Sequence, residues 1–584
     1  MIEEKIKNLI RESLKKLSIE RTEVSLEHPD EITHGDYSTN IAFTILRKIA
    51  VGTSKDIHVG ENLYWNRFGL EKPTSPRAVA GRILSILSKP EFIEKVEVAG
   101  AGFINFYLSR EFFAKSVAEI SASGGNFGQS SALSGKKVMV EYTDPNPFKE
   151  FHIGHLMSNA IGESLSRLVE FQGANVVRAC YQGDVGLHVA KAIYGMTHLK
   201  EKADYIAYLG EAYAFGASAY ESKPDAKKEI EIINKKIFEK SDKKIQALYT
   251  RGREESLKHF ENIYKKLGTK FDYNFFESEV ADEGVRIVKD FLTQHVFEVS
   301  EGAVVFRGDK HGLHTRVFIT SQGLPTYETK ELGLTKRKFE EVNPNLSIVV
   351  TANEQSDYFK VVLEAMRHID TEMAERTRHI AHGMLRFAES KMSSRKGNVI
   401  TGESLIASVE AMVHKKLEER ELETFEKNKI AEIVAIGAIK YSILRQATGS
   451  DIIFDFEKSI SFEGDSGPYL QYSYVRAKSV LEKAKQVGVS KGAPFATKGA
   501  PLLLERLLYR FPEIVKRAGN DYAPHLVATY LTELAAAFNS YYANNQIVNT
   551  GDKTSPYKVA LTSAFATVMK NGLWLLGIET PEKM

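Results

Sequence analysis

Cysteine is nearly absent from this 584-residue chain, which contains only Cys180. A single cysteine excludes a disulfide framework and any zinc site built from several cysteines. The 16 histidines are scattered and show no HExxH pattern, so we expect no tightly bound metal. Long apolar runs are also lacking, and the start of the chain, Met1 to Lys5, does not resemble a secretion signal. These absences predict a cytoplasmic protein without a membrane partner.

An excess of charge of one sign is lacking as well. The formal net charge is +2, and 43% of the residues are hydrophobic and 26% charged. This balance fits an enzyme of small substrates, but it does not exclude nucleic acid, because such binding depends on local charge. The length predicts about three to five domains.

Two short motifs carry the strongest signal for function. The first, His152-Ile153-Gly154-His155, follows a strand-like run over 137–142 and precedes a segment with helical apolar spacing. A strand, a loop and a helix in this order aim the free N–H groups of the helix start at a phosphate. The second motif, Lys391 to Gly397, is a basic loop that begins 239 positions later (391 − 152). A parallel-sheet nucleotide fold would bring both motifs to one ATP.

The two motifs resemble the signature pair of class I aminoacyl-tRNA synthetases, and the surrounding residues resemble arginyl-tRNA synthetases. The segments that carry the resemblance are Val140 to Asn146, Gly323 to Tyr327, Gly467 to Tyr472, His34 to Asn40 and Gly102 to Phe106. The resemblance implies ATP-dependent ligation of L-arginine to tRNA(Arg) through an arginyl-adenylate, with release of AMP and pyrophosphate. ATP and Mg2+ would be the cofactors, tRNA would be needed for amino-acid activation, and the protein would be a monomer.

The expected fold class is α/β, with several domains. The resemblance implies a Rossmann-like, parallel-sheet catalytic domain over 135–403 that carries a helical insertion over 196–268. An N-terminal α+β domain over 1–112 would contact tRNA, 113–134 would be a linker, and an all-α helical bundle over 404–584 would bind the anticodon. The apolar run 346–351 predicts a buried parallel strand. The runs 302–307 and 315–320 are expected to return to the same sheet.

Amino-acid activation on ATP depends on alignment and on neutralising phosphate charge. His152 and His155 lie one turn apart, and Gly154 lets a flat base approach the backbone. By resemblance, the catalytic candidates are His152, His155, Lys149, Lys391 and Lys396. The ATP-binding candidates are His152, Gly154, His155, Gly383, Met384, Lys391, Met392, Ser393, Ser394 and Arg395. Ser394 stands where the family has a second lysine, so Arg395 or Lys396 would supply that charge.

A guanidinium group presents five N–H donors and stays charged, so its pocket needs carboxylates and amide oxygens. The residues that match the family's arginine-binding positions are Glu141, Asn146, Tyr327, Glu331 and Gln355. Glu331 stands where the family usually has aspartate, and Glu328 is an alternative acid. His188 stands where glutamine is commoner.

The candidates for tRNA binding mix aromatic and polar side chains, on which unstacked bases can lie. They are Tyr37, Asn40, Phe462, Tyr469, Tyr472 and Arg476. Two other functions stay open. One is a class I synthetase for lysine or cysteine, of which the lone cysteine disfavours the second. The other is a paralogue that binds tRNA or ATP for regulation, which the intact first motif and the basic loop disfavour.

Overall fold

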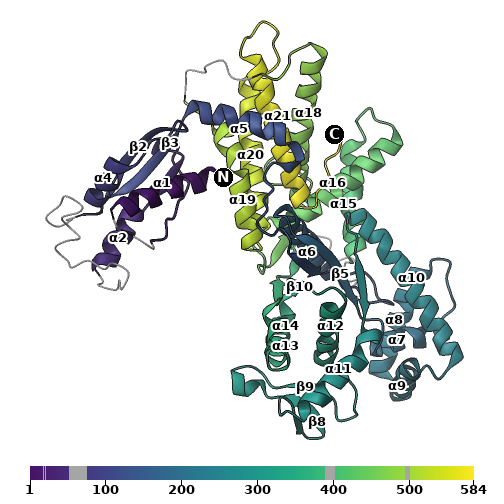
Figure 1. Ribbon diagram of the computed structural model, residues 1–584. Helices are drawn as coiled ribbons and strands as arrows, with labels where there is room; N and C mark the ends of the chain where they lie inside the picture. Colours follow the sequence, from purple (N-terminus) through teal and green to yellow (C-terminus); the bar gives the residue numbers. More distant parts are fainter. Residues whose placement is uncertain (18, 20–21, 51–74, 389–400, 493–499) are drawn as a thin grey trace. The chain divides into compact units, whose positions relative to one another are not determined.

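The structure is a computed structural model that describes the chain except residues 18, 20–21, 51–74, 389–400 and 493–499 (Figure 1). It divides into two compact units. Unit 1 comprises residues 1–128, 476–514 and 534–569, and unit 2 comprises 129–475, 515–533 and 570–584. Within the described ranges, no helix has the length and apolar character of a bilayer-spanning helix.

Unit 1 begins with a three-stranded antiparallel sheet in the order β1-β3-β2. Its strands are β1 (Tyr37–Thr39), β2 (Ile93–Ala99) and β3 (Phe103–Leu108), and its helices are α1 (Ile2–Lys16), α2 (Ile41–Ala50), α4 (Pro76–Ile86) and α5 (Arg110–Ser123). Strands β2 and β3 form an antiparallel hairpin. At its turn Gly102 has a φ of +144°, and a Cβ there would lie 2.7 Å from the Pro76 backbone. Only glycine fits this close approach.

Buried ion pairs join the N-terminal part of unit 1 to α19 (Leu503–Asn520). Asp36 accepts a hydrogen bond of 2.8 Å from the Leu108 amide and forms an ion pair with Arg506. Burial raises the pKa of Asp36, although both partners favour its charged form. Arg110 pairs with the buried Glu505 at 2.6 Å. Such pairs fix geometry, because losing one partner leaves a buried charge uncompensated.

Unit 2 is built on a five-stranded parallel sheet in the order β11-β10-β4-β5-β6. The strands are β4 (Lys137–Glu141), β5 (Asn175–Gln182), β6 (Tyr273–Phe276), β10 (Leu346–Ala352) and β11 (Thr377–His382). The predicted strands over 137–142 and 346–351 are therefore confirmed. The chain leaves β4 toward β5 on one side, while β10 and β11 lie on the other. A crevice opens at such a switch point, beyond the carboxyl ends of the strands.

Helices surround this sheet and extend the crossover between β5 and β6. They are α6 (Ile153–Phe171), α7 (Leu187–His198), α8 (Tyr205–Ser222), α9 (Pro224–Glu239), α10 (Lys243–Leu267), α11 (Glu277–Leu292), α12 (Tyr327–Glu341), α13 (Ser356–Ile369) and α14 (Thr371–Glu375). Helices α8 to α10 occupy the segment 196–268 and share a core with α7 that includes Ile193, Leu209 and Ile230. This helical module lies entirely within one strand-to-strand connection.

The expectation that 302–307 and 315–320 return to the main sheet is wrong. They form a separate antiparallel sheet, β7-β8-β9, made of β7 (Glu298–Ser300), β8 (Ala303–Phe306) and β9 (Arg316–Ile319). Phe306 and Phe318 are buried in one cluster with Val362 and Met366 of α13. These short strands bury their apolar side chains against a helix, which a short apolar run alone does not distinguish from a central strand.

The segment after 404 is mostly helical but is not all-α as predicted. Strand β12 (Leu385–Phe387) pairs in parallel with β13 (Ile452–Phe454). A three-residue strand is too short to show an alternating pattern. The helices are α15 (Gly402–Leu417), α16 (Thr424–Leu444), α17 (Phe456–Ser459), α18 (Gly467–Gln486), α19, α20 (His525–Asn544) and α21 (Ser555–Leu575).

Candidate active site

The loop after β4 leads directly to the helix that carries the first motif. Thr143 and Asp144 have φ values of +82° and +48°, which non-glycine residues rarely adopt. The Thr143 amide donates to the Ser158 hydroxyl at 3.0 Å, and Asp144 accepts from the Tyr181 amide at 2.7 Å. These contacts fix an uncommon backbone path at the carboxyl end of β4, which is typical of a functional site.

The two histidines of the first motif hold each other in place at the start of α6. His152 is the N-cap residue, and its amide donates to His155 Nδ1 at 3.2 Å. Their rings stack with 3.4 Å between centroids. Burial lowers the pKa of both imidazoles, and nearby charge on Lys149 lowers it further. Neutral imidazoles at a helix N-terminus can donate hydrogen bonds to a phosphate.

Gly154 lies against this histidine pair. A Cβ at Gly154 would lie 3.0 Å from both Cε1 and Nδ1 of His152. The glycine therefore leaves room for the His152 ring. Lys149 is half-buried, and its Nζ lies 5.2 Å from the centre of the Tyr213 ring. Burial lowers the pKa of Lys149, and an anion that binds beside it would favour its charged form.

A cluster of buried carboxyl groups lies at the end of β4 and along α12. Glu141 forms an ion pair of 2.6 Å with Lys338, and both side chains are at most 2% exposed. Burial raises the pKa of Asp144, and the neighbouring Glu141 charge raises it further. Burial also raises the pKa of Glu331 to about 7, although Lys338 acts in the opposite direction. Three carboxyl groups therefore share one ammonium group in a water-poor site.

The two alternative acids of α12 have different surroundings. Glu328 forms an ion pair of 3.0 Å with Arg316. Glu331 is 5% exposed and makes no hydrogen bond or ion pair with the described residues. A buried carboxyl group without a partner is costly, and a cationic ligand would remove that cost. Glu331 is thus the better placed of the two for a guanidinium group.

The remaining candidates for the amino-acid pocket come from the loop after β4, the first turns of α7 and α12, and the 3-10 turn after β10. Asn146 accepts a hydrogen bond of 3.1 Å from the Gly183 amide, and a Cβ at Gly183 would lie 2.4 Å from the same oxygen. His188 Nε2 donates to the Gly183 carbonyl at 2.8 Å, and burial lowers its pKa to about 4, so it is neutral. Tyr327 is 66% exposed, and Gln355 is exposed at the end of a short 3-10 turn.

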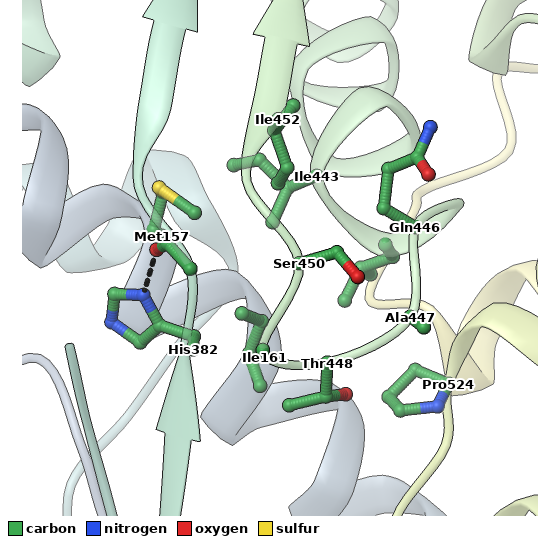
Figure 2. A pocket seen from close by; sticks show the side chains of 13 residues that line it. Met157, Ile161, His382, Ile443, Gln446, Ala447, Thr448, Ser450, Ile452 and Pro524 are labelled. Atoms are coloured by element: carbon green, nitrogen blue, oxygen red, sulfur yellow. Dashed lines mark hydrogen bonds between the residues drawn. The ribbon is translucent and has the colours of Figure 1, made fainter. Parts of the chain in front are cut away.

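Figure 2 shows that Ser450, from the loop before β13, and Ile452, at the start of β13, line a small cavity together with His382 at the end of β11. The Met384 amide donates to Asp451 at 2.9 Å, and its carbonyl accepts from the Ile452 amide at 2.8 Å. A Cβ at Gly383 would lie 2.2 Å from the Ser450 carbonyl oxygen. The cavity measures about 10 Å³, room for about one water. It is too small for a substrate, and the Met384 side chain is exposed.

The second motif and the tRNA candidates complete the predicted set. Lys391, Met392, Ser393, Ser394, Arg395 and Lys396 lie outside the described residues. Tyr37 is 1% exposed, and its hydroxyl donates to Glu513 at 2.5 Å, so its ring is part of a core. Asn40 is exposed. The rings of Phe462 and Tyr472 lie 6.1 Å apart in unit 2. Tyr469 is half-buried at the start of α18, and in unit 1 Arg476 lies 5.0 Å from the Tyr542 ring.

Lys338 was not predicted from the sequence. It lies 197 positions after Glu141 (338 − 141), in a helix whose other lysines are more exposed. A lysine within a charged helix usually indicates a solvent-facing side chain. The only sequence signal is its spacing of seven residues from Glu331, which places both on one helix face.

Comparison with known proteins agrees with this geometry. The family described as "tRNA synthetases class I (R), catalytic domain" matches residues 116–456. "Arginyl tRNA synthetase N terminal domain" matches residues 4–108, and "DALR anticodon binding domain" matches 470–584. The arginine–tRNA ligase of Clostridium perfringens is 32% identical over 519 residues, which cover 87% of this chain and 91% of that protein. That of Halothermothrix orenii is 28% identical and covers 100% of this chain and 99% of that protein.

Solved structures show the same fold. The arginyl-tRNA synthetase of Thermus thermophilus superposes with a TM-score of 0.79 at 22% identity and full coverage of both chains. That of Plasmodium falciparum gives 0.77 at 21% identity, covering 100% of this chain and 99% of that one. The parallel sheet, its switch point and the histidine-bearing helix start define a class I aminoacyl-tRNA synthetase. Because the catalytic-domain match spans more than half of the sequence, the chain belongs to the arginyl-tRNA synthetase family.

Proposed function

We propose that this chain is an arginine–tRNA ligase, which joins L-arginine to tRNA(Arg) through an arginyl-adenylate and releases AMP and pyrophosphate. The observation that carries the proposal is the buried Glu331, whose carboxyl group makes no hydrogen bond or ion pair among the described residues, beside the Glu141–Lys338 pair. Since Lys338 already neutralises Glu141, the pocket offers a net acceptor for one more cation. Arginine supplies a cation whose planar donors match a carboxylate in two places.

The chain's own residues would orient arginine in this pocket. Glu331 and Glu141 would accept from the guanidinium, and the Asn146 amide, held by Gly183, would accept from the amino-acid end. Tyr327 and Gln355 are exposed and would complete the enclosure around the bound amino acid. Placing the arginine carboxylate at the switch point brings it next to the start of α6.

ATP would be held by its phosphates at the histidine pair. The neutral imidazoles of His152 and His155 and the N–H groups of the α6 start would donate to phosphate oxygens, and Lys149 would add a cation. Mg2+ would arrive with ATP and reduce its negative charge. The arginine carboxylate then attacks the α-phosphorus, the bond to the bridging oxygen breaks, and pyrophosphate leaves. Donors that align with the transition state supply the rate enhancement.

The partners and setting follow from this reaction. We propose that tRNA(Arg) contacts Asn40 in the N-terminal part, Arg476, and the half-buried rings of Phe462, Tyr469 and Tyr472. The burial of Tyr37 argues for an indirect role, in which it positions Glu513. We further propose a cytoplasmic monomer that activates arginine only when tRNA is bound.

The test is arginine-dependent ATP–pyrophosphate exchange, measured with and without tRNA(Arg) and with each of the other amino acids. Exchange with arginine alone supports the proposal. His155→Ala should lower the rate of exchange about 10²–10³-fold, which is the usual effect of losing one hydrogen-bond donor to the transition state. The affinity for tRNA should be the same as that of the wild type. His414→Ala is the matched control, because His414 is a half-buried histidine whose ring bonds to Asn428 and lies outside the predicted site. Exchange with another amino acid, or tRNA binding without any exchange, would favour the other synthetase or the regulatory paralogue.

A further inference from the structure

A cluster of metal-binding side chains lies where the small antiparallel sheet meets α13. His311 ends the short 3-10 turn Gly308–His311 after β8, and Glu364 and His368 are four residues apart on one face of α13. His311 Nδ1 and His368 Nε2 each lie 3.5 Å from the same oxygen, Glu364 Oε1. One ligand atom of each residue lies within 4.8 Å of the other two. None of the three belongs to the predicted substrate or tRNA sites.

The surroundings hold these side chains in position. The His311 ring stacks on the buried Phe306 with 5.6 Å between centroids and 14° between planes. The His368 ring lies 6.1 Å from Phe306 and 4.9 Å from His311. Arg367 pairs with Glu364 Oε2, so that Oε1 remains directed at the two imidazoles. Neighbours that orient the ligands in this way raise metal affinity.

The distances suit a tetrahedral transition-metal ion. Bonds of about 2.0–2.1 Å place neighbouring ligand atoms about 3.4 Å apart in a tetrahedron. The two nitrogen-to-oxygen separations of 3.5 Å already match. The histidine side chains are exposed, so a small ring rotation can bring the nitrogens together. Two imidazoles and one carboxylate favour Zn2+ and its neighbours over Mg2+ or Ca2+, which require mainly oxygen ligands.

We propose that His311, Glu364 and His368 bind one divalent transition-metal ion of the Zn2+ type, with water at the fourth position. This inference does not rest on the proposed ligase function. It replaces the sequence-based expectation of no metal, because ligands spread over 57 positions (368 − 311) form no local motif. The ion would join the turn after β8 to α13 and stabilise this part of the fold by binding only its folded form.

The experiment uses the full chain, without a histidine tag and freed of metal with EDTA. Co2+ is added as a coloured probe, and Zn2+ affinity is measured by competition with a chromophoric chelator. The variants are His311→Ala, His368→Ala and Glu364→Gln. His295→Ala is the control, since that exposed histidine makes no side-chain hydrogen bond, ion pair or ring contact among the described residues. We expect one equivalent of Co2+ with tetrahedral absorption for the wild type and the control, and at least a tenfold loss of Zn2+ affinity for each ligand variant.

Thermal unfolding provides a second readout. Zn2+ should raise the Tm of the wild type and of His295→Ala but not of the three ligand variants, each compared with its own metal-free Tm. If His311→Ala and His368→Ala bind Zn2+ as tightly as the wild type, the proposal is wrong. If one variant has a lower metal-free Tm than the wild type, the Zn2+ affinities of the other two variants test the proposal.

Discussion

The pH dependence of arginine binding should report the ionisation of Glu331. This carboxyl group must lose its proton to pair with a guanidinium, yet burial raises its pKa from 4.5 to about 7. In the free enzyme the folded state therefore holds a proton that the unfolded chain releases above pH 4.5. With respect to this group, stability falls as the pH rises from 4.5 to 7, while competence to bind arginine increases.

The magnitude follows from the fraction ionised. For a pKa of about 7, about one-eleventh of Glu331 is ionised at pH 6 and about ten-elevenths at pH 8, so kcat/KM for arginine should rise about tenfold. Glu331→Gln removes this titration. It also removes one partner of a buried charge pair, at a cost of about 2–5 kcal/mol, or about 30- to 5000-fold in kcat/KM at pH 8. The ratio of wild-type to Glu331→Gln kcat/KM should therefore fall about tenfold from pH 8 to pH 6.

The assay is arginine-dependent ATP–pyrophosphate exchange in the presence of tRNA, over varied arginine concentrations from pH 6 to pH 8. The ratio of wild-type to variant kcat/KM cancels the titrations that both proteins share. Glu328→Gln is the matched control, because that acid is already paired with Arg316. A ratio that does not change with pH would refute the argument from Glu331. A larger loss of kcat/KM in Glu328→Gln than in Glu331→Gln would assign the guanidinium contact to Glu328.

Three further predictions concern stability. Burial lowers the pKa of Lys440 to about 7, so between pH 7 and 10.5 the unfolded chain binds more protons than the folded protein. The free energy of unfolding of the wild type, relative to that of Lys440→Met, should therefore rise by about 1.4 kcal/mol per pH unit in this range. Thermal unfolding of both proteins at several pH values measures this difference. Arg506→Met leaves the buried Asp36 without its ion pair and should lower stability by about 3–5 kcal/mol. Adding Asp36→Asn should restore most of this stability. Hydrogen exchange in residues 1–108 should be faster in Arg506→Met than in the double variant, and equal exchange in these two variants would contradict the prediction. Gly162→Ala would place a Cβ 2.2 Å from a buried tyrosine ring and should cost about 1–3 kcal/mol. Gly81→Ala meets nothing within 4 Å in a helix and should stabilise by about 0.5–1 kcal/mol, so a similar Tm for both variants would contradict the packing argument.

The central sheet could be predicted because its strands are continuous apolar runs. The run over 346–351 is buried on both faces as β10, and the histidine motif follows β4 as its spacing indicates. The runs at 302–307 and 315–320 resemble the run over 346–351 in their apolar character, but in the structure they pair with each other and not with the central sheet. Local apolarity reports burial and not the partner that buries it, so sheet membership could not be read from it.

The candidate site could be predicted in its residue types but not in its charge balance. The resemblance supplied Glu141 and Glu331, whereas Lys338 became visible only when β4 and α12 were placed together. The choice between Glu328 and Glu331 on α12 likewise depended on Arg316, which comes from β9. Long-range pairing of charged groups leaves no periodic signal along the chain.

The position of β4 in the sheet has a consequence for how the protein is made. One edge of β4 pairs with β5, less than 40 positions later, but the other pairs with β10, whose Leu346 lies opposite Val138, 208 positions earlier (346 − 138). At about 5–20 residues per second, roughly 10–40 s of synthesis separate the two strands. A nascent chain therefore carries its central strand with one open edge, which offers unpaired N–H and C=O groups to any other extended segment. From the strand order we expect this edge to need protection on the ribosome until β10 has been made.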